Sequence, residues 1–405
     1  MKTTQAQNQE QLQGWNIKKW LKNIITLGVK VPLWGIQYLG CFIPIKKNRI
    51  LIYSLKQNGF SGNLKYLYQE LQKNYTEFFE ILWIVKNSDV CKHFEKSGIP
   101  VTNVHSWKHF LYRHRAGIVI TDDEFYAPCI NRKKQLLINV WHGGINYKKI
   151  GFSGIRFANQ LQKYIYHLSN PQPDIFISGS QSFLETSAKA FDFDKKIFFE
   201  CGLPRNVVFF KDYSHLYKKV RTTLNLPETS KLVLYAPTFR KGLEAPATQF
   251  NWAAITNTLK ERFGGDWIIL IRQHYFVKGK TAESENIIDV SEYEDMQELL
   301  CACDCLVSDY SSCMWDYSFT GRPCFVLGED LDEYYEHDRS FSIPLEKWPY
   351  SICRNEQELC DRISTFDSDA YIEKVKCHHL EMGSYENENA SQLLIKKMIE
   401  KLEEI

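Results

Sequence analysis

The chain has 405 residues, of which 44% are hydrophobic and 24% charged, a composition typical of globular proteins that excludes bulk disorder. Its length suits two domains with separate cores, at roughly 150 residues per domain. The net charge of +2 gives no global attraction to nucleic acid. The 12 cysteines lack zinc-ribbon spacing and lie in apolar runs, so we expect reduced thiols that pack as small hydrophobes, as at Cys301, Cys303 and Cys305.

The segment 14–48 is rich in aromatic and aliphatic residues, and its first apolar positions follow helical spacing with lysines on the other face. No Asp or Glu occurs between residues 11 and 69. Anionic lipid attracts such a basic segment by about 1 kcal/mol per Lys or Arg near the surface. Because Pro32 and Pro44 interrupt any spanning helix, we expect residues 14–48 to lie on the membrane. The alternative is that this helix braces its own domain.

Apolar, β-rich runs then alternate with helical patterns along the chain. In the first half these runs lie at 50–54, 80–87, 116–121, 135–141 and 174–180. After a long basic helix predicted at 206–224, they resume at 231–240, 266–274, 287–291 and 305–307. Strands that alternate with helices imply right-handed crossovers and parallel sheets. The sequence therefore predicts an α/β protein.

This alternation divides the chain into segments of different character. We predict disorder at 1–13, the membrane-associating segment at 14–48, a first α/β domain at 49–205, a second at 206–380 and a C-terminal helix at 381–405. Two open α/β domains place a cleft at the carboxyl ends of their strands, where such sheets bind ligands. The chain has no Walker or GxGxxG loop, so polar residues at the strand ends are the candidates for a site.

The first of these strand ends reads NVWHGGINYKKIG. His142 leaves a predicted strand into Gly143 and Gly144, and Lys148 and Lys149 follow. Glycines leave the backbone around the imidazole open, so a substrate can approach and a proton can move at neutral pH. A lone histidine at a strand end is more often structural. The hypothesis of an active site therefore depends on the other strand ends.

Basic residues mark three further strand ends. Arg205 lies in the turn CGLPRN at the domain junction, Thr238 and Arg240 follow the strand in YAPTFR, and Arg272 and His274 end the run DWIILIRQH. Arginine is suited to bidentate contact with phosphate. These positions predict an anionic ligand in the second domain.

The last strand end is SDYSSCMWD, in which Ser308, Asp309, Ser311 and Ser312 lead into a helix that carries Asp316. Free backbone N–H groups and the positive end of a helix dipole suit a phosphate at such a turn. Ser and Asp are also common helix caps with no further role, which is the alternative for this short pattern. The succession of polar strand ends favours the phosphate site.

The motifs WHG with KKIG, GLPRN, YAPTFR, R-x-H and SDYSS-x-x-x-D, with GRP downstream, resemble the motif series of the CDP-glycerol glycerophosphotransferases. This family comprises teichoic acid primases and polymerases and related capsule enzymes, and the resemblance covers roughly residues 50–395. It implies a GT-B fold, in which two Rossmann-like domains face a central cleft. It also implies transfer of a polyol phosphate from a CDP-polyol to a hydroxyl of a membrane-linked acceptor, with release of CMP.

The resemblance also implies roles for individual residues. His142 and His274 match histidines needed for activity in the family; His142 is expected to accept the proton of the acceptor hydroxyl, and His274 to stabilise the CMP leaving group. The expected donor contacts are Arg205, Thr238, Arg240, Arg272, Ser308, Asp309, Ser311, Ser312 and Asp316. The expected acceptor contacts are Gly143, Gly144, Lys148 and Lys149.

Two readings of Asp316 stay open, because it can serve the donor ribose or hold its helix in place. The chain also departs from the family pattern. Gly144, Ile145 and Asn146 stand where Thr-Pro is common, and Tyr275 replaces the proline that usually follows the second histidine. The first departure lies where the acceptor is expected, so it bears on acceptor identity.

The expected partners are CDP-glycerol or CDP-ribitol, a lipid-linked acceptor and the anionic inner leaflet, at the cytoplasmic face of a bacterial membrane. No cofactor and no metal are expected, since a cationic set can replace Mg²⁺ and no paired acids suited to a metal occur. Three alternatives remain: a ribitolphosphotransferase, a GT-B glycosyltransferase that uses a nucleotide sugar, and an inactive membrane scaffold. A scaffold has no physical need of both histidines.

Overall fold

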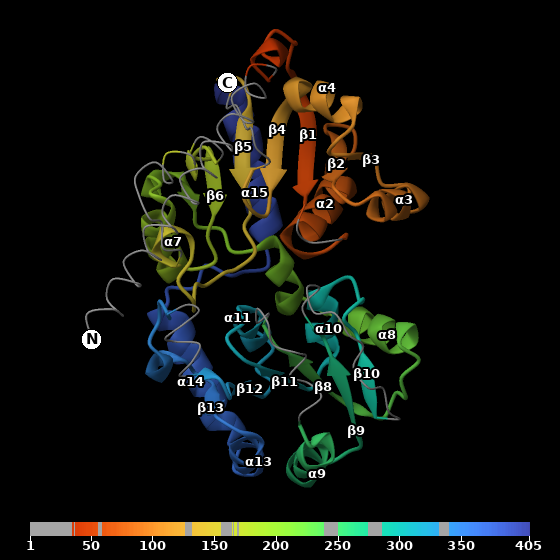
Figure 1. Cartoon of the computed structure of the whole chain (residues 1–405), viewed down its shortest axis with the longest axis vertical. Coiled ribbons are helices and arrows are strands. Elements are labelled where there is room, and N and C mark those ends of the chain that lie inside the picture. The colour runs from red at the N-terminus through yellow and green to blue at the C-terminus, as the bar shows by residue number, and fades with distance from the viewer. Residues whose placement is uncertain are drawn as a thin grey trace, which may run out of the picture.

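The computed structural model describes residues 35, 37–55, 59–125, 132–154, 164, 166–167, 170–238, 250–273, 286–331 and 340–405. The predicted disordered residues and most of the predicted membrane segment lie outside this range. Two α/β domains stack along the long axis of the molecule (Figure 1). The chain has the α/β architecture with parallel sheets that the sequence predicts.

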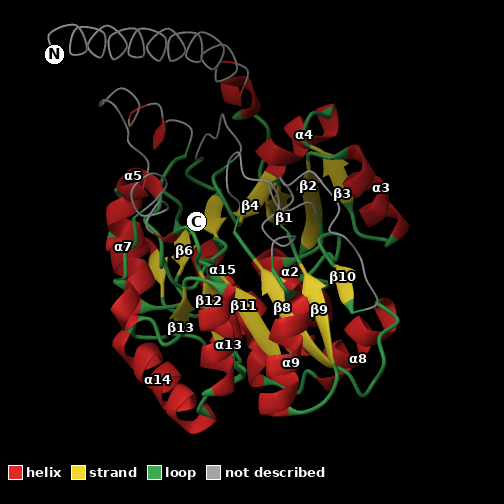
Figure 2. Ribbon diagram, turned by 60° about the horizontal axis from the view of Figure 1, so that its bottom comes forward, coloured by secondary structure: helices red, strands yellow, loops and turns green. Residues whose placement is uncertain are grey.

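The first domain is built on a seven-stranded sheet of order β3-β2-β1-β4-β5-β6-β7, in which every neighbouring pair is parallel. Its strands are β1 (Lys46–Ser54), β2 (Glu80–Val85), β3 (Val101–Asn103), β4 (Ala116–Thr121), β5 (Leu136–Asn139), β6 (Ile175–Ile177) and β7 (Phe198–Phe199). Its helices are α2 (Gly62–Asn74), α3 (Ser88–Lys96), α4 (Trp107–Arg115), α5 (Gly151–Gly154) and α7 (Gln181–Phe191), with a 3-10 turn η1 (Lys195–Ile197). Helices lie on both faces of the sheet (Figure 2).

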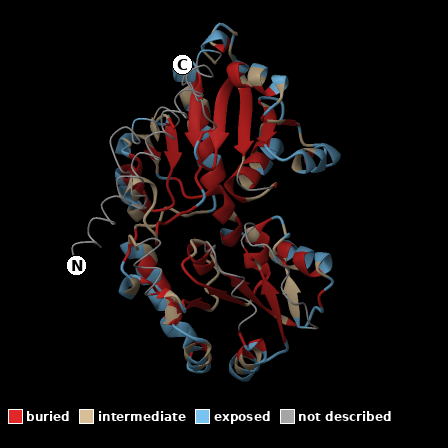
Figure 3. Cartoon of the chain, viewed as in Figure 1, coloured by how far each residue is buried: buried red, intermediate tan, exposed pale blue. Residues whose placement is uncertain are grey.

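Strand β1 shows why these apolar runs become central strands. Ile50 and Ile52 pack in one hydrophobic core, whereas Leu51 and Tyr53 pack in another on the opposite face. Successive side chains of a strand point to opposite faces, so a strand covered on both sides needs an unbroken apolar run. Figure 3 shows the resulting pattern, with buried strands inside and exposed helical surfaces outside.

The second domain is built on a six-stranded sheet of order β10-β9-β8-β11-β12-β13, also parallel throughout. Its strands are β8 (Lys231–Ala236), β9 (Trp267–Ile271), β10 (Ile287–Asp289), β11 (Cys305–Ser308), β12 (Cys324–Leu327) and β13 (Ser351–Cys353). Its helices are α8 (Ser214–Thr223), α9 (Trp252–Phe263), α10 (Met296–Ala302), α11 (Cys313–Ser318), α13 (Glu356–Ser364) and α14 (Ser368–Glu381), with a 3-10 turn η4 (Leu345–Lys347). The thiols of Cys301, Cys303 and Cys305 are free and fully buried, as predicted.

The strand order reverses once in each sheet, beside β1 and β4 in the first and beside β8 and β11 in the second. Ligands of open α/β sheets bind at the carboxyl ends of the strands next to such a reversal. Thr238 follows β8 and Asp309 follows β11, while the His142 turn follows β5, which neighbours β4. The predicted strand ends are therefore the ones at which the topology favours a site.

The single long helix predicted at 206–224 is wrong. The structure has a 3-10 segment, η2 (Pro204–Phe210), followed by α8. Asp212 separates them, because its carboxylate accepts hydrogen bonds from the backbone N–H (2.9 Å) and the hydroxyl (3.0 Å) of Ser214. A short acidic side chain that bonds the backbone just ahead of it starts a new helix and competes with continuation of the old one.

The C-terminal helix α15 (Ala390–Glu404) returns to the first domain. Its buried residues Leu394, Ile395, Met398 and Leu402 belong to the core beneath the first sheet. The chain therefore crosses between the domains twice, at η2 and again between α14 and α15 (Figure 1). These two crossings lie at the junction of the two domains.

A buried ion-pair cluster also joins the domains. Lys65 of α2 lies 3.0 Å from Asp295 and 2.6 Å from Glu298 of the α10 region. Burial by itself lowers the pKa of Lys65, but the two carboxylates outweigh it and raise that pKa above its usual value. Lys65 is therefore charged, and removing it would leave buried acids with less compensation.

Candidate active site between the two domains

The His142 turn begins with an uncommon backbone conformation. Trp141 has a φ of +42°, which residues other than glycine seldom adopt. The backbone N–H of Trp141 donates a hydrogen bond to the side-chain oxygen of Asn139 (2.8 Å). The imidazole of His142 is exposed and stacks on the Trp141 ring, with centroids 4.3 Å apart. Such a conformation persists where the surroundings hold it, and it is common at functional sites.

The tautomer of His142 follows from its partner. Its Nδ1 lies 3.0 Å from the backbone oxygen of Asp122. A carbonyl oxygen can only accept, so Nδ1 carries the proton and the lone pair of the neutral ring is on Nε2. This arrangement suits a general base, because Nε2 can take a proton while Nδ1 fixes the ring.

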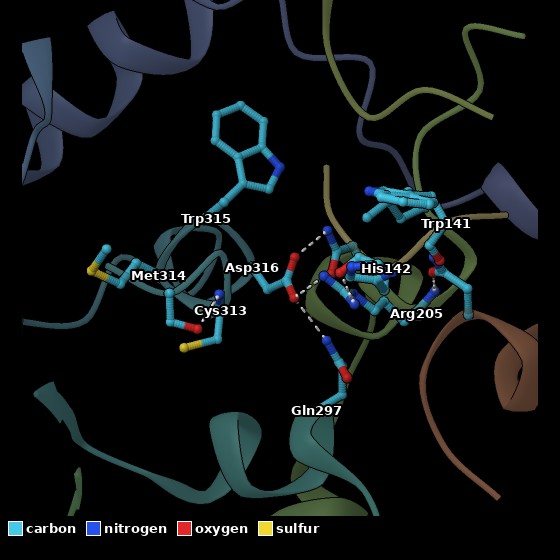
Figure 4. Close-up of polar contacts among 12 residues, drawn as sticks. Trp141, His142, Arg205, Gln297, Cys313, Met314, Trp315 and Asp316 are labelled. Atoms are coloured by element: carbon cyan, nitrogen blue, oxygen red, sulfur yellow. Dashed lines mark hydrogen bonds and ion pairs between the residues drawn. The ribbon is translucent and has the colours of Figure 1, made fainter. Parts of the chain in front are cut away.

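Arg205 connects this turn to the second domain (Figure 4). Its Nη1 donates to the backbone oxygen of His142 (2.9 Å), and its Nη2 lies 2.7 Å from the carboxylate of Asp316. Asn206 and Gln297 each donate to Asp316 as well, both at 3.0 Å. Burial raises the pKa of Asp316, and the charge of Arg205 opposes that shift. These contacts support the interpretation in which Asp316 holds its helix in place.

Asn63, at the start of α2, is a further link that the motifs do not reveal. Its side-chain amide donates to the backbone oxygens of Val140 (2.7 Å) and Trp141 (2.9 Å), and its oxygen accepts from the backbone N–H of Arg205 (3.2 Å). Asn63 thus ties the His142 turn to η2 from within the first domain.

On the second domain, Asp309 braces the turn 308–312, where the donor is predicted to bind and which we call the donor-side turn. Its carboxylate accepts from the backbone N–H of Thr238 (3.0 and 2.9 Å) and from the Thr238 hydroxyl (2.8 Å). Ser308 is fully buried, and its hydroxyl donates to the backbone oxygen of Ala236 (2.6 Å). The structure therefore places Ser308 behind the turn, where its hydroxyl holds two strands together and does not reach the surface.

Ser311 and Ser312 lie at the surface of this turn and are half-buried. The Ser311 hydroxyl accepts from the backbone N–H of Cys313 (3.3 Å), and Ser312 is the residue before α11. Gly143 lies directly opposite, since a Cβ at that position would be 3.7 Å from the side chain of Ser312. The His142 turn and the donor-side turn therefore lie against each other where the two domains meet.

Arg272 directly follows β9 and is half-buried. Within the described part of the chain, its Nη1 is a buried donor that has no hydrogen-bond partner. Burial lowers the pKa of this guanidinium, and Asp295 opposes the shift. A cation with a buried, unused donor favours an anionic ligand. Arg240 and His274, the other predicted contacts of this domain end, lie outside the described residues.

The predicted acceptor residues lie at the domain contact. A Cβ on Gly144 would come within 2.6 Å of the Trp315 indole nitrogen and 2.7 Å of Glu386, so the space admits only glycine there. Lys148 and Lys149 are half-buried and run antiparallel to residues 340–342 of the second domain. The departure from the family pattern at 144–146 thus lies in an interdomain contact, and its bearing on the acceptor stays a prediction.

Glu386, in the crossing between α14 and α15, is a site residue that the sequence analysis missed. Its carboxylate accepts from the backbone N–H of Leu203 (2.8 Å), the Asn206 amide (3.0 Å) and the Trp315 indole (3.3 Å). Burial raises the pKa of Glu386 to about 8. An isolated acid in a polar segment gives no periodic or motif signal, so the sequence could not single it out.

Among the residues that the structure describes, no group of three or more His, Cys, Asp or Glu side chains is placed to hold a metal ion. The described site residues that are placed to bind an anionic substrate, Arg272, Ser311 and Ser312, offer a guanidinium and hydroxyl groups.

Two parallel-sheet domains that meet at polar strand ends form an α/β fold with a candidate site at the domain contact. The chain belongs to the CDP-glycerol:poly(glycerophosphate) glycerophosphotransferase family, whose model matches residues 37–400, and this confirms the predicted family. The chain is 29% identical over 360 residues to the teichoic acid glycerol-phosphate transferase of Staphylococcus aureus, covering 85% of this chain and 91% of that protein.

A longer relative and a solved structure are also similar to this chain, and both are teichoic acid polymerases. The teichoic acid poly(glycerol phosphate) polymerase of Staphylococcus epidermidis is 28% identical over 372 residues, which are 86% of this chain but only 50% of that protein. This chain thus spans about half the length of that polymerase. The structure of a variant of the wall teichoic acid polymerase TagF soaked with CDPG superposes with a TM-score of 0.78 at 25% identity, covering 95% of this chain and 98% of that one.

Proposed function

We propose that this chain transfers glycerol phosphate from CDP-glycerol to a hydroxyl of a lipid-linked acceptor and releases CMP, in teichoic acid or capsular polymer synthesis. The observation that carries the proposal is the contact between the His142 turn and the donor-side turn, since Gly143 lies against Ser312. A proton acceptor and a turn suited to phosphate therefore face each other across the domains. The family description and both relatives above favour glycerol as the polyol. The two-domain layout fits the GT-B type.

The reaction we propose is an in-line displacement at the β-phosphorus of CDP-glycerol. The acceptor oxygen forms a bond to this phosphorus, its proton passes to Nε2 of His142, and the bond to the oxygen bridging to the α-phosphorus breaks. The electron pair of that bond leaves with CMP. Catalysis of such a step depends on positioning and on stabilising the developing charge.

Groups of the second domain would stabilise the leaving CMP. The unpartnered Nη1 of Arg272 and the surface hydroxyls of Ser311 and Ser312 are the described candidates. Arg240 and His274 are proposed to act with them, as the family resemblance implies. Hydrogen bonds to charged groups are stronger than neutral ones, so a few such donors can replace a metal ion here.

The decisive experiment measures CMP release from CDP-glycerol, with CDP-ribitol and a nucleotide sugar in parallel, in the presence of detergent-solubilised lipid acceptors. We expect acceptor-dependent release from CDP-glycerol, and a loss of about 10² to 10⁴ in rate for His142→Ala. His93→Ala is the matched control, because His93 is exposed on α3 and distant from the cleft. Full activity of His142→Ala, or consumption of the nucleotide sugar alone, would refute the proposal.

We further propose that the enzyme works as a peripheral protein on the anionic inner leaflet, with the segment 14–48 as its attachment. Residues 37–43 and α4 lie at the end of the first domain away from the second (Figures 1 and 2), and both segments carry large apolar side chains that are exposed. They are Tyr38, Leu39, Phe42 and Trp107. Helix α4 has no Asp or Glu and carries three permanent cations, of which Lys108 and Arg115 are exposed and Arg113 is buried.

Within the described part of the chain, no helix is long and apolar enough to cross a membrane. Exposed aromatic and basic side chains together suit the interface of an anionic bilayer. Flotation with vesicles that contain phosphatidylglycerol tests this proposal. We expect binding that falls when Phe42 and Trp107 are both changed to Ser, and equal recovery with neutral vesicles would count against it.

A further inference from the structure

The segment that follows His142 leaves its own domain. Ile145 and Tyr147 are each 1% exposed, and they pack in the core of the second domain, whose other members begin at Val208. The backbone oxygen of Tyr147 also accepts a hydrogen bond from the backbone N–H of Ser342 (2.8 Å). A short piece of the first domain is therefore anchored inside the second.

Tyr147 engages the second domain with both its hydroxyl and its ring. Its hydroxyl lies 3.1 Å from the Tyr350 hydroxyl and 3.0 Å from Nε2 of His378, and its ring centroid is 4.4 Å from that of Trp348. Burial raises the pKa of Tyr147 far above its usual value, so the hydroxyl stays neutral. A large aromatic side chain with both its ring and its hydroxyl engaged is a rigid attachment point.

The same aromatic cluster reaches the donor-side turn. Trp348 packs against Phe341 with centroids 5.4 Å apart, and Phe341 packs edge-on against Tyr310 at 5.3 Å. Tyr310 lies within the turn 308–312, between the braced Asp309 and the surface serines. Tyr147 is thus connected by packed rings to the turn proposed to hold the donor phosphates.

On its other side, Tyr147 limits the freedom of the His142 turn. Between His142 and the buried segment lie only Gly143 and Gly144, which restrict the backbone less than any other residues. The first domain also holds this segment, because the Gly144 oxygen accepts from the Ser180 hydroxyl (2.8 Å) and the Asn146 amide donates to the Ser187 hydroxyl (2.8 Å). Upstream, Trp141 is fixed by Asn139 at the end of β5. The imidazole therefore lies on a short span that the first domain holds at Trp141, Gly144 and Asn146, and that Tyr147 fastens to the second domain.

We infer that Tyr147 is a positioning residue, which holds the His142 turn in register with the donor-side turn. This inference rests on the role proposed above for His142. Tyr147 touches no reacting group, so its loss should lower turnover and leave CDP-glycerol binding intact. A displacement of about 1 Å at a reacting group can cost on the order of 10²-fold in rate.

The first test compares Tyr147→Leu with Tyr147→Phe. Leu keeps an apolar side chain in the core but loses the ring, and we expect kcat to fall at least about tenfold while the Kd of CDP-glycerol, measured by calorimetry, stays within about twofold. Phe keeps the ring, and we expect kcat within about threefold of the wild type, since a single hydrogen bond contributes modestly. An unchanged kcat in the Leu variant would overturn the inference.

Leu359→Ala is the matched control. Leu359 is fully buried in the same core, on α13, and makes none of the contacts described above. We expect it to lower the thermal midpoint without lowering kcat at the assay temperature. If Tyr147→Leu does not fold, Trp348→Phe loosens the same cluster from the second domain, and the same split between kcat and Kd is expected.

A double-mutant cycle separates positioning from general damage. If Tyr147 acts through His142, then Tyr147→Leu lowers the rate of the wild type but has no further effect in the His142→Ala background. An equal fold-loss in both backgrounds would refute the inference and leave the proposed function standing. Full activity of His142→Ala alone would instead refute the proposed function, so the two failures are distinguishable.

Discussion

The two turns that meet at the cleft are built in opposite ways. The donor-side turn is braced within its own domain, where Asp309 accepts three hydrogen bonds from Thr238 and Ser308 is fastened to the neighbouring strand. The His142 turn has two glycines and an exposed ring, and contacts from the other domain complete it. The comparison teaches that the donor-side turn is set by contacts within one domain, whereas the His142 turn draws on contacts from both domains.

Arg205→Met is expected to have the largest effect, because it disconnects the His142 turn from the second domain. It removes the guanidinium that joins the backbone of His142 to Asp316, and it leaves a buried carboxylate without its cation. Breaking a buried pair from one side costs about 3–5 kcal/mol, so we expect a loss of that size in urea unfolding together with loss of transfer activity.

The control for this prediction is the double change Arg205→Met with Asp316→Leu. It removes both charges, so we expect most of the stability to return while activity stays low. A double variant as unstable as the single one would show that the pair is not the cause.

Glu386 sits where the two turns and both chain crossings converge, and it makes the stability pH-dependent. Its pKa is raised to about 8 by burial, above the value of an unfolded chain. The folded state therefore holds a proton that the unfolded state releases, so this contribution is full below about pH 4.5 and is lost as the pH rises through 8.

Glu386→Gln removes the titrating group and keeps its shape. We expect the free energy of unfolding of the wild type, measured with urea, to fall between pH 5 and pH 8 relative to that of the variant. The fall should be on the order of a few kcal/mol. Parallel profiles for the two proteins would contradict this assignment.

The adjacent glycines give a matched pair that sharpens the comparison. A Cβ on Gly144 would lie 2.6 Å from the Trp315 indole, whereas one on Gly143 would meet nothing closer than 3.5 Å. Overpacking a tight site costs about 1–3 kcal/mol, so we expect Gly144→Ala to lose stability by this amount in thermal unfolding. Gly143→Ala should fold normally, and equal destabilisation of both would argue against the tight fit.

The smallest effect is expected on the braced side. Thr238→Val removes the hydroxyl bond to Asp309 but keeps both backbone contacts. One hydrogen bond is worth about 1 kcal/mol, so we expect the free energy of unfolding in urea to fall by that amount. We expect the Kd of CDP-glycerol to rise by less than about tenfold. A larger loss than for Gly144→Ala would mean that the donor-side turn is less firmly braced than its contacts imply.

The sequence by itself determined most of the described strands and the residues at their ends. Apolar runs such as 50–54 and 116–121 can be buried on both faces only as central parallel strands, and the motifs around His142 and Asp309 follow such strands directly. These features are local in the chain, so periodicity and spacing reveal them. The break between η2 and α8 was missed because a single Asp212 outweighed the helical pattern around it.

Only the tertiary structure decided what joins those strand ends. Arg205 reaches Asp316 across more than a hundred residues, Tyr147 is buried in a domain other than its own, and Glu386 lies in a segment with no pattern. Hydrogen bonds and packing between distant segments depend on how two surfaces meet in space, and neither a helical nor a strand period records that. The sequence therefore predicts which residues could form the site, and the domain contact determines how they are held.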